Sequence, residues 1–165
     1  MDSTLYLSFT ENGFLHSFTA SQNYLTSSWK VHFLVMHCKN TEHIYLGEYT
    51  KFRKRVLNFI KNRPIDDQRQ IKIELNSVYM KIVQSYITHY VARLHKNKPS
   101  DTTLYEYGQK IMNRFQRIID KFKIDINVTR VYQPHKVAFH FAWNGDILAS
   151  YYVFKNTDTD KLEIS

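Results

Sequence analysis

The stretch Thr50–Arg63 reads TKFRKRVLNFIKNR and marks a change in the pattern of the sequence. Before this stretch, apolar residues recur mostly at every second position, as they do in strands. Within it they recur at spacings of three and four, at Phe52, Val56, Phe59 and Ile60. Pro64 follows Arg63, and proline disfavours helical geometry in the residue before it. The stretch therefore predicts an amphipathic helix that begins near Thr50 and ends at Arg63.

Residues 1–48 are predicted to form strands. Leu5, Leu7 and Phe9 alternate with polar neighbours, and Glu11-Asn12-Gly13 has the composition of a tight turn, which indicates an opening hairpin into Phe14–Thr19. A third strand is expected over Trp29–Cys38, and a short fourth over His43–Gly47. One face of the third strand would carry Trp29, Val31, Phe33 and Val35, and the other Leu34 and Met36.

Two more helices are expected after Pro64. Asp66 and Asp67 suit the start of a long helix that ends near Asn97–Pro99. Its apolar stripe would consist of Ile71, Leu75, Val78, Ile82, Tyr86, Tyr90 and Leu94. Thr103 followed by Glu106 resembles a capping box that opens the third helix. The stripe of that helix would consist of Leu104, Ile111, Phe115, Ile118 and Phe122.

The period returns to two after Ile124. Ile124–Val128 and Val137–Trp143 alternate, and Asn144-Gly145 predicts a hairpin turn into Ile147–Lys155. The predicted class is therefore α+β, as a single domain over residues 1–165 with strands in 1–48, a basic helical segment in 49–123, strands in 124–155 and a frayed tail in 156–165. Most simply, the outer segments share one largely antiparallel sheet that the three helices cover on one face. Two small sheets flanking a helical layer remain open as an alternative.

Composition indicates a protein of the cytoplasm. Cys38 is the only cysteine among 165 residues, so no disulfide can form within the chain, and this favours a reducing compartment. The N-terminal residues lack the basic and apolar segments of a signal peptide, and no apolar stretch approaches the roughly 20 residues of a membrane span. We therefore expect no membrane association.

The positive charge is concentrated in one part of the chain. Residues 49–98 contain twelve Lys or Arg against three acids, whereas residues 1–48 contain two against four. The whole chain has a formal net charge of +8. A concentrated positive field on a protein attracts polyanions, of which nucleic acid is the most common.

The candidate nucleic-acid site lies on the first predicted helix and extends into the second. Projected at 3.6 residues per turn, the cations and amides of Thr50–Arg63 fall on the face opposite the apolar residues. Long donors at this spacing suit successive phosphates. The predicted site residues are Lys51, Lys54, Arg55, Asn58, Lys61, Arg63, Arg69 and Lys72. A solvated face that only maintains solubility would have the same pattern.

Other groups of chemically active residues favour ordinary structural roles. Tyr86 and Tyr90 are expected in the core, whereas Tyr79 and Arg93 are expected to face outward. Histidines and a cysteine at His32, His37, Cys38 and His43 do not have the spacing of a structural zinc site. Cys38 is expected to be a small buried residue, and we predict no metal and no cofactor.

A third group could support metal-independent cleavage of RNA. It consists of Arg130, Tyr132, His135, His140, Asp146 and Tyr152, whose side chains include proton donors and acceptors and a cation for charge at phosphorus. The predicted combination of strands and helices loosely resembles the toxins that cut messenger RNA. No motif spacing assigns catalytic roles to these residues, and a solvent-facing side of a strand explains them more simply.

These observations favour a small regulatory protein that binds nucleic acid, with DNA expected, through the phosphate backbone. The alternative is a protein-interaction regulator or inhibitor that docks its basic helix on an acidic surface of transcription or nucleic-acid-processing machinery. The bias toward Asn, Lys, Ile and Tyr resembles in composition the host-takeover proteins of AT-rich bacteriophages, which suit this alternative. A metal-independent ribonuclease is third, because the chain has no complete catalytic motif.

Overall fold

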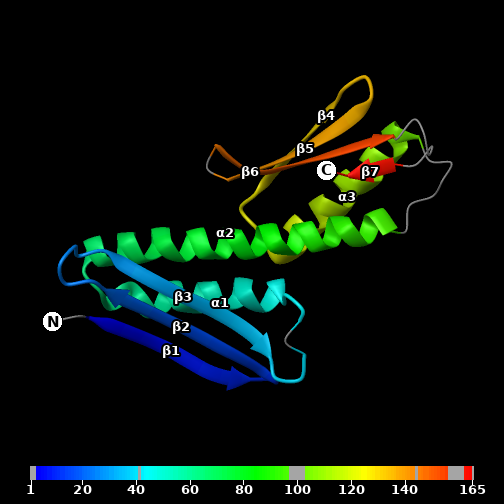
Figure 1. Cartoon of the computed structure of the whole chain (residues 1–165). Coiled ribbons are helices and arrows are strands. Elements are labelled where there is room, and N and C mark those ends of the chain that lie inside the picture. The colour runs from blue at the N-terminus through cyan, green and yellow to red at the C-terminus, as the bar shows by residue number, and fades with distance from the viewer. Residues whose placement is uncertain (1–2, 41, 97–102, 144, 156–161, 165) are drawn as a thin grey trace. The chain divides into compact units, whose positions relative to one another are not determined.

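The computed structural model describes residues 3–40, 42–96, 103–143, 145–155 and 162–164. Within these ranges the chain forms seven strands, three α-helices and one 3₁₀ helix (Figure 1). In chain order they are β1 (Thr4–Glu11), β2 (Phe14–Gln22), β3 (Trp29–His37), α1 (Leu46–Phe59), the 3₁₀ helix η1 (Ile60–Asn62), α2 (Ile65–Lys96), α3 (Leu104–Phe122), β4 (Asn127–Tyr132), β5 (Lys136–Trp143), β6 (Asp146–Lys155) and β7 (Leu162–Ile164).

The fold is α+β, as predicted, but its strands form two sheets instead of one. β1-β2-β3 make a three-stranded antiparallel sheet, and β4-β5-β6-β7 make a four-stranded one. The favoured expectation of one shared sheet was therefore wrong, and the strands form two small sheets, as the alternative allowed, because each strand pairs with its neighbour in the sequence, as consecutive strands commonly do. The chain divides into two compact units, unit 1 over Met1–Val83 and unit 2 over Gln84–Ser165, so that α2 contributes to both.

The sheet of unit 1 buries one face. The predicted hairpin turn is present, with Asn12 at φ 54° and Gly13 at φ 83°, and Gly13 occupies this left-handed conformation without the strain of a side chain. The inward residues follow the alternation expected from the sequence: Phe9, His16 and Val35 lie side by side across the strands, as do Leu7, Phe18 and Phe33.

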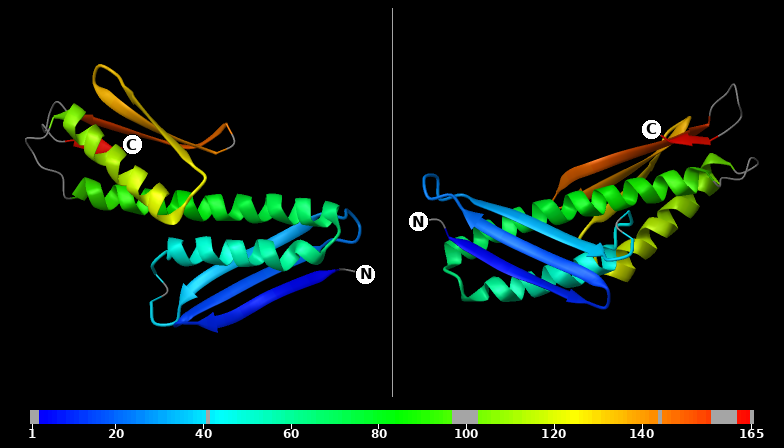
Figure 2. Two further views of the ribbon diagram at one scale, coloured as in Figure 1. Left: turned by 180° about the vertical axis from the view of Figure 1, so that it is seen from behind. Right: turned by 60° about the horizontal axis from the view of Figure 1, so that its bottom comes forward.

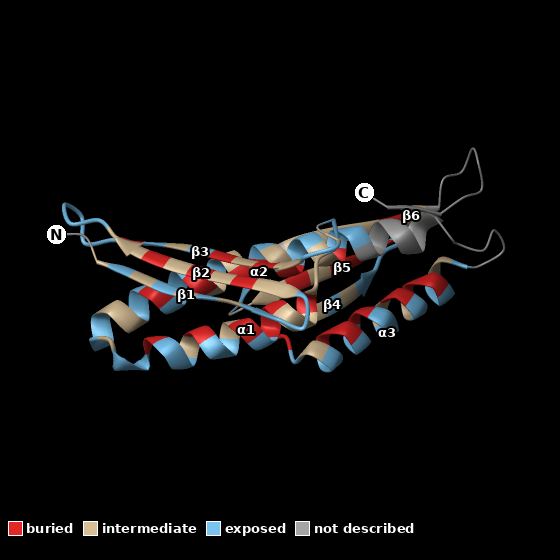
Figure 3. Cartoon of the chain, turned by 90° about the horizontal axis from the view of Figure 1, so that it is seen from below, coloured by how far each residue is buried: buried red, intermediate tan, exposed pale blue. Residues whose placement is uncertain are grey.

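Helix α1 covers this inward face. Seen from behind, α1 lies in front of the strands (Figure 2). Phe52 is 1% exposed, and its ring contacts those of Phe9, His16 and Phe33 at centroid distances of 5.5, 5.1 and 5.3 Å. Val56 and Ile60 continue the buried stripe predicted for this helix, whereas Phe59 of that stripe is 38% exposed. Figure 3 shows buried and exposed positions alternating along α1, as the helical period requires.

The predicted strand over His43–Gly47 is wrong, because α1 begins at Leu46, four residues before the predicted Thr50. Leu46 and Tyr49 are 1% and 7% exposed, and both belong to the helical spacing that continues at Phe52. The end of the segment agrees with the prediction. η1 ends at Asn62, and Arg63, before Pro64, has extended geometry with ψ 158°.

The first half of α2 packs beside α1 in unit 1. Its fully buried positions step by four, at Ile71, Leu75, Tyr79 and Val83, whereas Val78 and Ile82 of the predicted stripe are only half-buried. Tyr79 was predicted to face outward, but it is 1% exposed. Its hydroxyl donates to Thr50 Oγ1 at 2.7 Å, since Thr50 itself donates to the Leu46 carbonyl.

In unit 2, helix α3 packs against the four-stranded sheet. Thr103 caps α3 as predicted, with its hydroxyl oxygen accepting from the Glu106 amide at 3.2 Å. Phe115 contacts Phe139 and Phe141 of β5, edge to face, at 5.7 and 4.8 Å. Ile111, Phe115 and Ile118 of the predicted stripe are buried, whereas Leu104 and Phe122 are half-buried. The aromatic contacts fix α3 against the strands.

The remaining boundaries of unit 2 differ slightly from the sequence prediction. Ile124 and Ile126 are buried, but the strand they were expected to begin starts at Asn127. Leu162–Ile164 pairs with β6 as β7, so the prediction of a frayed tail is wrong for these three residues. Residues 156–161 of the tail lie outside the described residues, as do Asn144 of the predicted hairpin turn and the side chains of Tyr90, Arg93 and Leu94.

Two buried tyrosines allow a comparison of how much a side-chain hydroxyl contributes to the free energy of unfolding with and without a hydrogen-bond partner. Tyr79 donates to Thr50, whereas the Tyr107 hydroxyl is buried with no hydrogen-bond partner among the described residues. Burial also raises the pKa of Tyr107, which Arg114 offsets only in part. We predict that Tyr79→Phe lowers the free energy of unfolding by about 1 kcal/mol, whereas Tyr107→Phe leaves it unchanged or raises it by up to about 1 kcal/mol. Urea unfolding of both variants checks this, and an equal loss in both would contradict it.

Candidate nucleic-acid interface

Four predicted site residues form one continuous surface on α1. Lys51, Lys54, Arg55 and Asn58 are all exposed, and their spacing of i, i+3, i+4 and i+7 places them along one side of the helix. We call these four residues the α1 ridge. Lys61 in η1 is exposed as well, and it follows Lys54 by seven residues. The ridge exists because the apolar stripe through Phe52 and Val56 is held against the sheet.

Acidic residues partly neutralise the α1 ridge. Arg55 Nη1 lies 2.9 Å from Glu11 Oε2, and Lys51 Nζ lies 3.8 Å from Glu48 Oε1. The Arg55–Glu11 pair is about half exposed on both sides, so water screens it and its contribution to stability is small. Arg55 is also positioned by packing, because its guanidinium lies 4.1 Å from the centre of the Phe9 ring.

The other predicted cations differ in their exposure and in whether an acidic side chain lies near them. Among the described residues, no acid lies within ion-pairing distance of Lys54, Lys61, Arg69 or Lys72, all of which are exposed. Arg63 is half-buried and lies 3.9 Å from Asp67. Its Nε is buried without a partner in the described part of the chain. The exposed cations are therefore better placed than Arg63 to meet a ligand.

A polar cavity of about 120 Å³ borders the α1 ridge. Helix α1 supplies four of its lining residues at the spacing i, i+3, i+4 and i+7, and the β1–β2 hairpin supplies the others. The lining residues are Glu11, Asn12, His16, Glu48, Lys51, Phe52 and Arg55. Two members of the α1 ridge, Lys51 and Arg55, therefore also line the cavity. The sequence analysis did not find this site, because its residues come from segments more than thirty positions apart.

His16 is the buried polar group of this cavity. It is 4% exposed, stacks on Phe9 with ring centroids 4.5 Å apart, and places Nε2 3.3 Å from Glu48 Oε2. Because a carboxylate can only accept, Nε2 donates to Glu48. Nδ1 is buried and has no partner among the described residues. This donation holds the Glu48 carboxylate in place at the cavity.

The C-terminal group proposed for ribonuclease activity is not brought together. Arg130 pairs with Phe139 in the sheet and donates to Gln109 of α3 at 2.7 Å, so it lies on the helix-covered face. His140 is the next residue of β5 and therefore points to the opposite face, where Nδ1 lies 2.7 Å from Ser150 Oγ. Burial raises the pKa of Tyr132, although Arg130 opposes this.

The group divides into two pairs on opposite faces of the sheet: the Arg130 guanidinium lies 5.1 Å from the centre of the Tyr132 ring, and the rings of His140 and Tyr152 meet with centroids 6.3 Å apart. Tyr132 donates to the Tyr105 carbonyl at 3.2 Å, and its ring packs within 3.1 Å of where a Cβ on Gly108 would lie. His135 and Asp146 are exposed at opposite ends of the β5–β6 pair. The Lys136 Nζ lies 4.9 Å from the centre of the Tyr152 ring. The arrangement does not supply a shared point at which one phosphate could contact all these groups.

The His and Cys residues do not gather around a common point either. In the described ranges, no three His, Cys, Asp or Glu side chains are placed to hold a metal ion. The Lys39 amide donates to His37 Nδ1 at 3.1 Å, and His32 and His43 are exposed. Cys38 was expected to be buried, but it is exposed. Its amide donates to the Gly13 carbonyl at 2.9 Å, which places it beside the β1–β2 turn.

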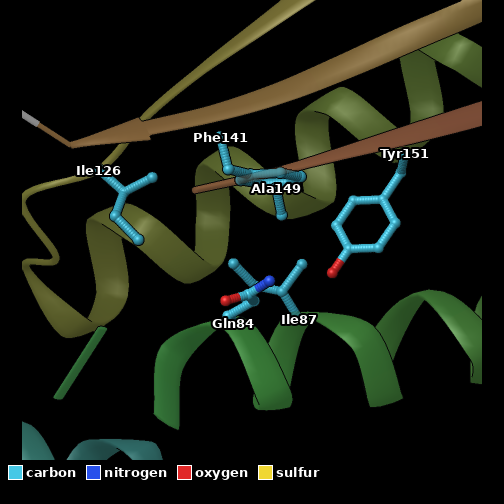
Figure 4. Close-up of a pocket in the computed structure, with 6 residues that line it drawn as sticks. All are labelled: Gln84, Ile87, Ile126, Phe141, Ala149 and Tyr151. Carbon is cyan, nitrogen blue, oxygen red and sulfur yellow. The ribbon is translucent and has the colours of Figure 1, made fainter. Parts of the chain in front are cut away.

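A second cavity lies within unit 2 and is apolar. Figure 4 shows Gln84 and Ile87 of α2 pointing toward Phe141, Ala149 and Tyr151. It encloses about 10 Å³, roughly the space that one water molecule needs. A space of this size between packed side chains is a packing gap, and it offers no room for a ligand.

Helix α3 carries a basic stripe that the sequence analysis did not single out. Lys110, Arg114, Arg117 and Lys121 are all exposed at spacings of three and four. The exposed acids Glu106 and Asp120 lie on the same helix and reduce its net charge. We keep the α1 ridge as the candidate interface because a polar cavity borders it, and we use the α3 stripe as its internal control.

No protein-family model, no curated protein and no solved structure matches this chain. The site is therefore assigned from its own geometry. Among the described residues, α2 is the longest helix, with 32 residues, and neither it nor another described helix is apolar enough to cross a membrane.

Two substitutions separate the roles of pairing and packing at Arg55. We predict that Glu11→Gln changes the free energy of unfolding by less than about 1 kcal/mol, because the ion pair is exposed. Arg55→Ala is expected to cost more, since it also removes the contact with the Phe9 ring. Urea unfolding at one salt concentration measures both. Equal losses would show that the ion pair, and not the ring contact, holds Arg55.

Proposed function

We propose that this chain is a small cytoplasmic regulatory protein that binds nucleic acid through the α1 ridge. The observation that carries the proposal is the common exposure of Lys51, Lys54, Arg55 and Asn58 along one side of a helix whose other side is buried. Cationic side chains on successive turns suit contacts with successive phosphates, and an amide among them can reach a base edge. DNA is the expected ligand.

We infer that the predicted cations outside α1 extend this surface. Lys61, Arg69 and Lys72 are exposed and have no acid within ion-pairing distance in the described ranges. The ion pairs of Lys51 and Arg55 do not prevent phosphate binding, because an exposed pair is weak and a phosphate can replace the carboxylate. With four to six phosphates contacted, the logarithm of the affinity for duplex DNA should fall against the logarithm of the salt concentration with a slope of about −4 to −5.

The salt dependence of matched double variants tests the location of the interface. Lys54→Glu/Lys61→Glu reverses two free cations seven residues apart on and beyond α1, and Lys110→Glu/Arg117→Glu does the same on α3. We predict that the first variant binds duplex DNA at least about tenfold more weakly and has a slope shallower by about two, because each lysine lost removes about one released counterion. The second variant should differ from the unmodified protein by less than about threefold.

Fluorescence anisotropy with a labelled random duplex between 50 and 200 mM salt, a range over which the effect of phosphate contacts is large, provides the measurement. Circular dichroism of both variants is the check that each is folded. Binding that does not respond to salt would contradict the proposal itself. Loss of binding in the α3 variant alone would move the interface to α3.

The second candidate is a regulator or inhibitor that docks the same ridge on an acidic protein surface, in the manner of a phage host-takeover factor. The mixture of charges favours it: Glu11 and Glu48 lie among the cations, and such patterns give specificity between protein surfaces. A pull-down compared with a gel shift on random DNA and RNA separates the two candidates. Captured acidic proteins without a nucleic-acid shift would support the second.

A further inference from the structure

The cavity beside the α1 ridge has a charge balance that differs from that of a phosphate site. Its two cations each face a carboxylate, Arg55 facing Glu11 and Lys51 facing Glu48. An isolated anion that entered would meet two carboxylates as well as two cations. The ligand that suits this cavity is therefore neutral overall and has both hydrogen-bond donors and acceptors.

The cavity offers more acceptors than the protein uses. Glu48 Oε2 accepts from His16, yet a carboxylate has about four lone-pair sites. Glu48 is 28% exposed and Glu11 54%, so both can be reached from solvent. Asn12, in the turn above them, adds an amide that both donates and accepts. A ligand that presents N–H donors can bind here without displacing the existing contacts of His16.

Aromatic side chains complete the lining. His16 and Phe52 are 4% and 1% exposed, and their rings meet at 70° with centroids 5.1 Å apart. Aromatic walls with polar groups at the edge are the usual surroundings of an unpaired base held by a protein. A space of about 120 Å³ is below the roughly 300–1,000 Å³ of sites for drug-sized ligands, and it suits a single ring system.

We propose that this cavity binds one unpaired nucleobase that carries an exocyclic amino group, while the α1 ridge holds the adjacent phosphates of a single strand. The amino group donates to the Glu48 carboxylate, and Lys51 and Arg55 reach from the cavity to the backbone on either side. The inference rests on the proposed function, because the ridge must first bring the strand to the cavity. It adds that single-stranded segments with cytosine, adenine or guanine are preferred to uracil.

Cytosine and uracil provide the cleanest comparison, because they differ chiefly in whether an amino group or a carbonyl oxygen occupies one position. Affinities of the unmodified protein for labelled (dC)12 and (dU)12 are measured by anisotropy at pH 7.5 and one salt concentration. We expect (dC)12 to bind about fivefold or more tightly, since a hydrogen bond to a charged acceptor is gained with cytosine and an oxygen faces that acceptor with uracil. Equal binding of the two, or a preference for (dU)12, would overturn the inference and leave the proposed function intact. No binding of either would also overturn the inference, whereas the proposed function is tested separately by binding to duplex DNA.

Substitution of the acceptor locates the preference. Glu48→Gln should reduce the ratio of the two affinities to below about twofold, since it removes the charged acceptor. Glu74→Gln removes the same charge from an exposed position of α2 that does not line the cavity, so its ratio should match that of the unmodified protein. Glu11→Gln is the second cavity variant, in case Glu48→Gln does not fold. A ratio that persists in a folded Glu48→Gln variant would place base recognition elsewhere and overturn the inference.

Discussion

The contacts of Phe52 determine how unit 1 presents its charge. This ring meets Phe9, His16 and Phe33 from three strands, and it is almost completely buried. Once Phe52 and Val56 face the sheet, the helical period places the neighbouring lysines on the opposite side of α1, where they face solvent. The α1 ridge is thus a consequence of aromatic packing. Any change that rotates α1 would move both the ridge and the cavity, because Phe52 belongs to the cavity wall as well.

The same helix offers two kinds of surface that suit two parts of one ligand. Toward solvent, Lys54 and Asn58 present donors with no carboxylate within ion-pairing distance in the described ranges. Toward the β1–β2 hairpin, Glu48 and Arg55 present mixed charge above buried aromatic rings. A nucleotide has a similar division, with a uniformly anionic backbone and a flat base that has donors and acceptors. Mixed charge, which at first weakens the case for a phosphate-binding ridge, is therefore what a base-binding cavity beside it requires.

Local patterns predicted local structure well. Asn12-Gly13 predicted the first hairpin, and Thr103 predicted the start of α3, because each of these signals depends on residues only a few positions apart. Tyr79 was wrongly predicted to face outward because a stripe through Val78 and one through Tyr79 both have helical spacing after Leu75. The hydrogen bond that Tyr79 makes with Thr50 of α1 could not be read from that spacing. The cavity could not be predicted from spacing, since Glu11 and Glu48 come to line the same space only after α1 has packed against the sheet. A histidine at an inward strand position, His16, was the one signal that could have indicated it.

The exposure of Cys38 has a practical consequence. It is the only thiol of the chain, and its backbone amide is bonded to Gly13, beside the turn that carries Asn12. A maleimide dye would therefore attach at a single known position without any engineering of the sequence. Because the Cys38 amide is hydrogen-bonded to Gly13, the residue after the cavity residue Asn12, a dye on this thiol would report on the β1–β2 turn beside the cavity.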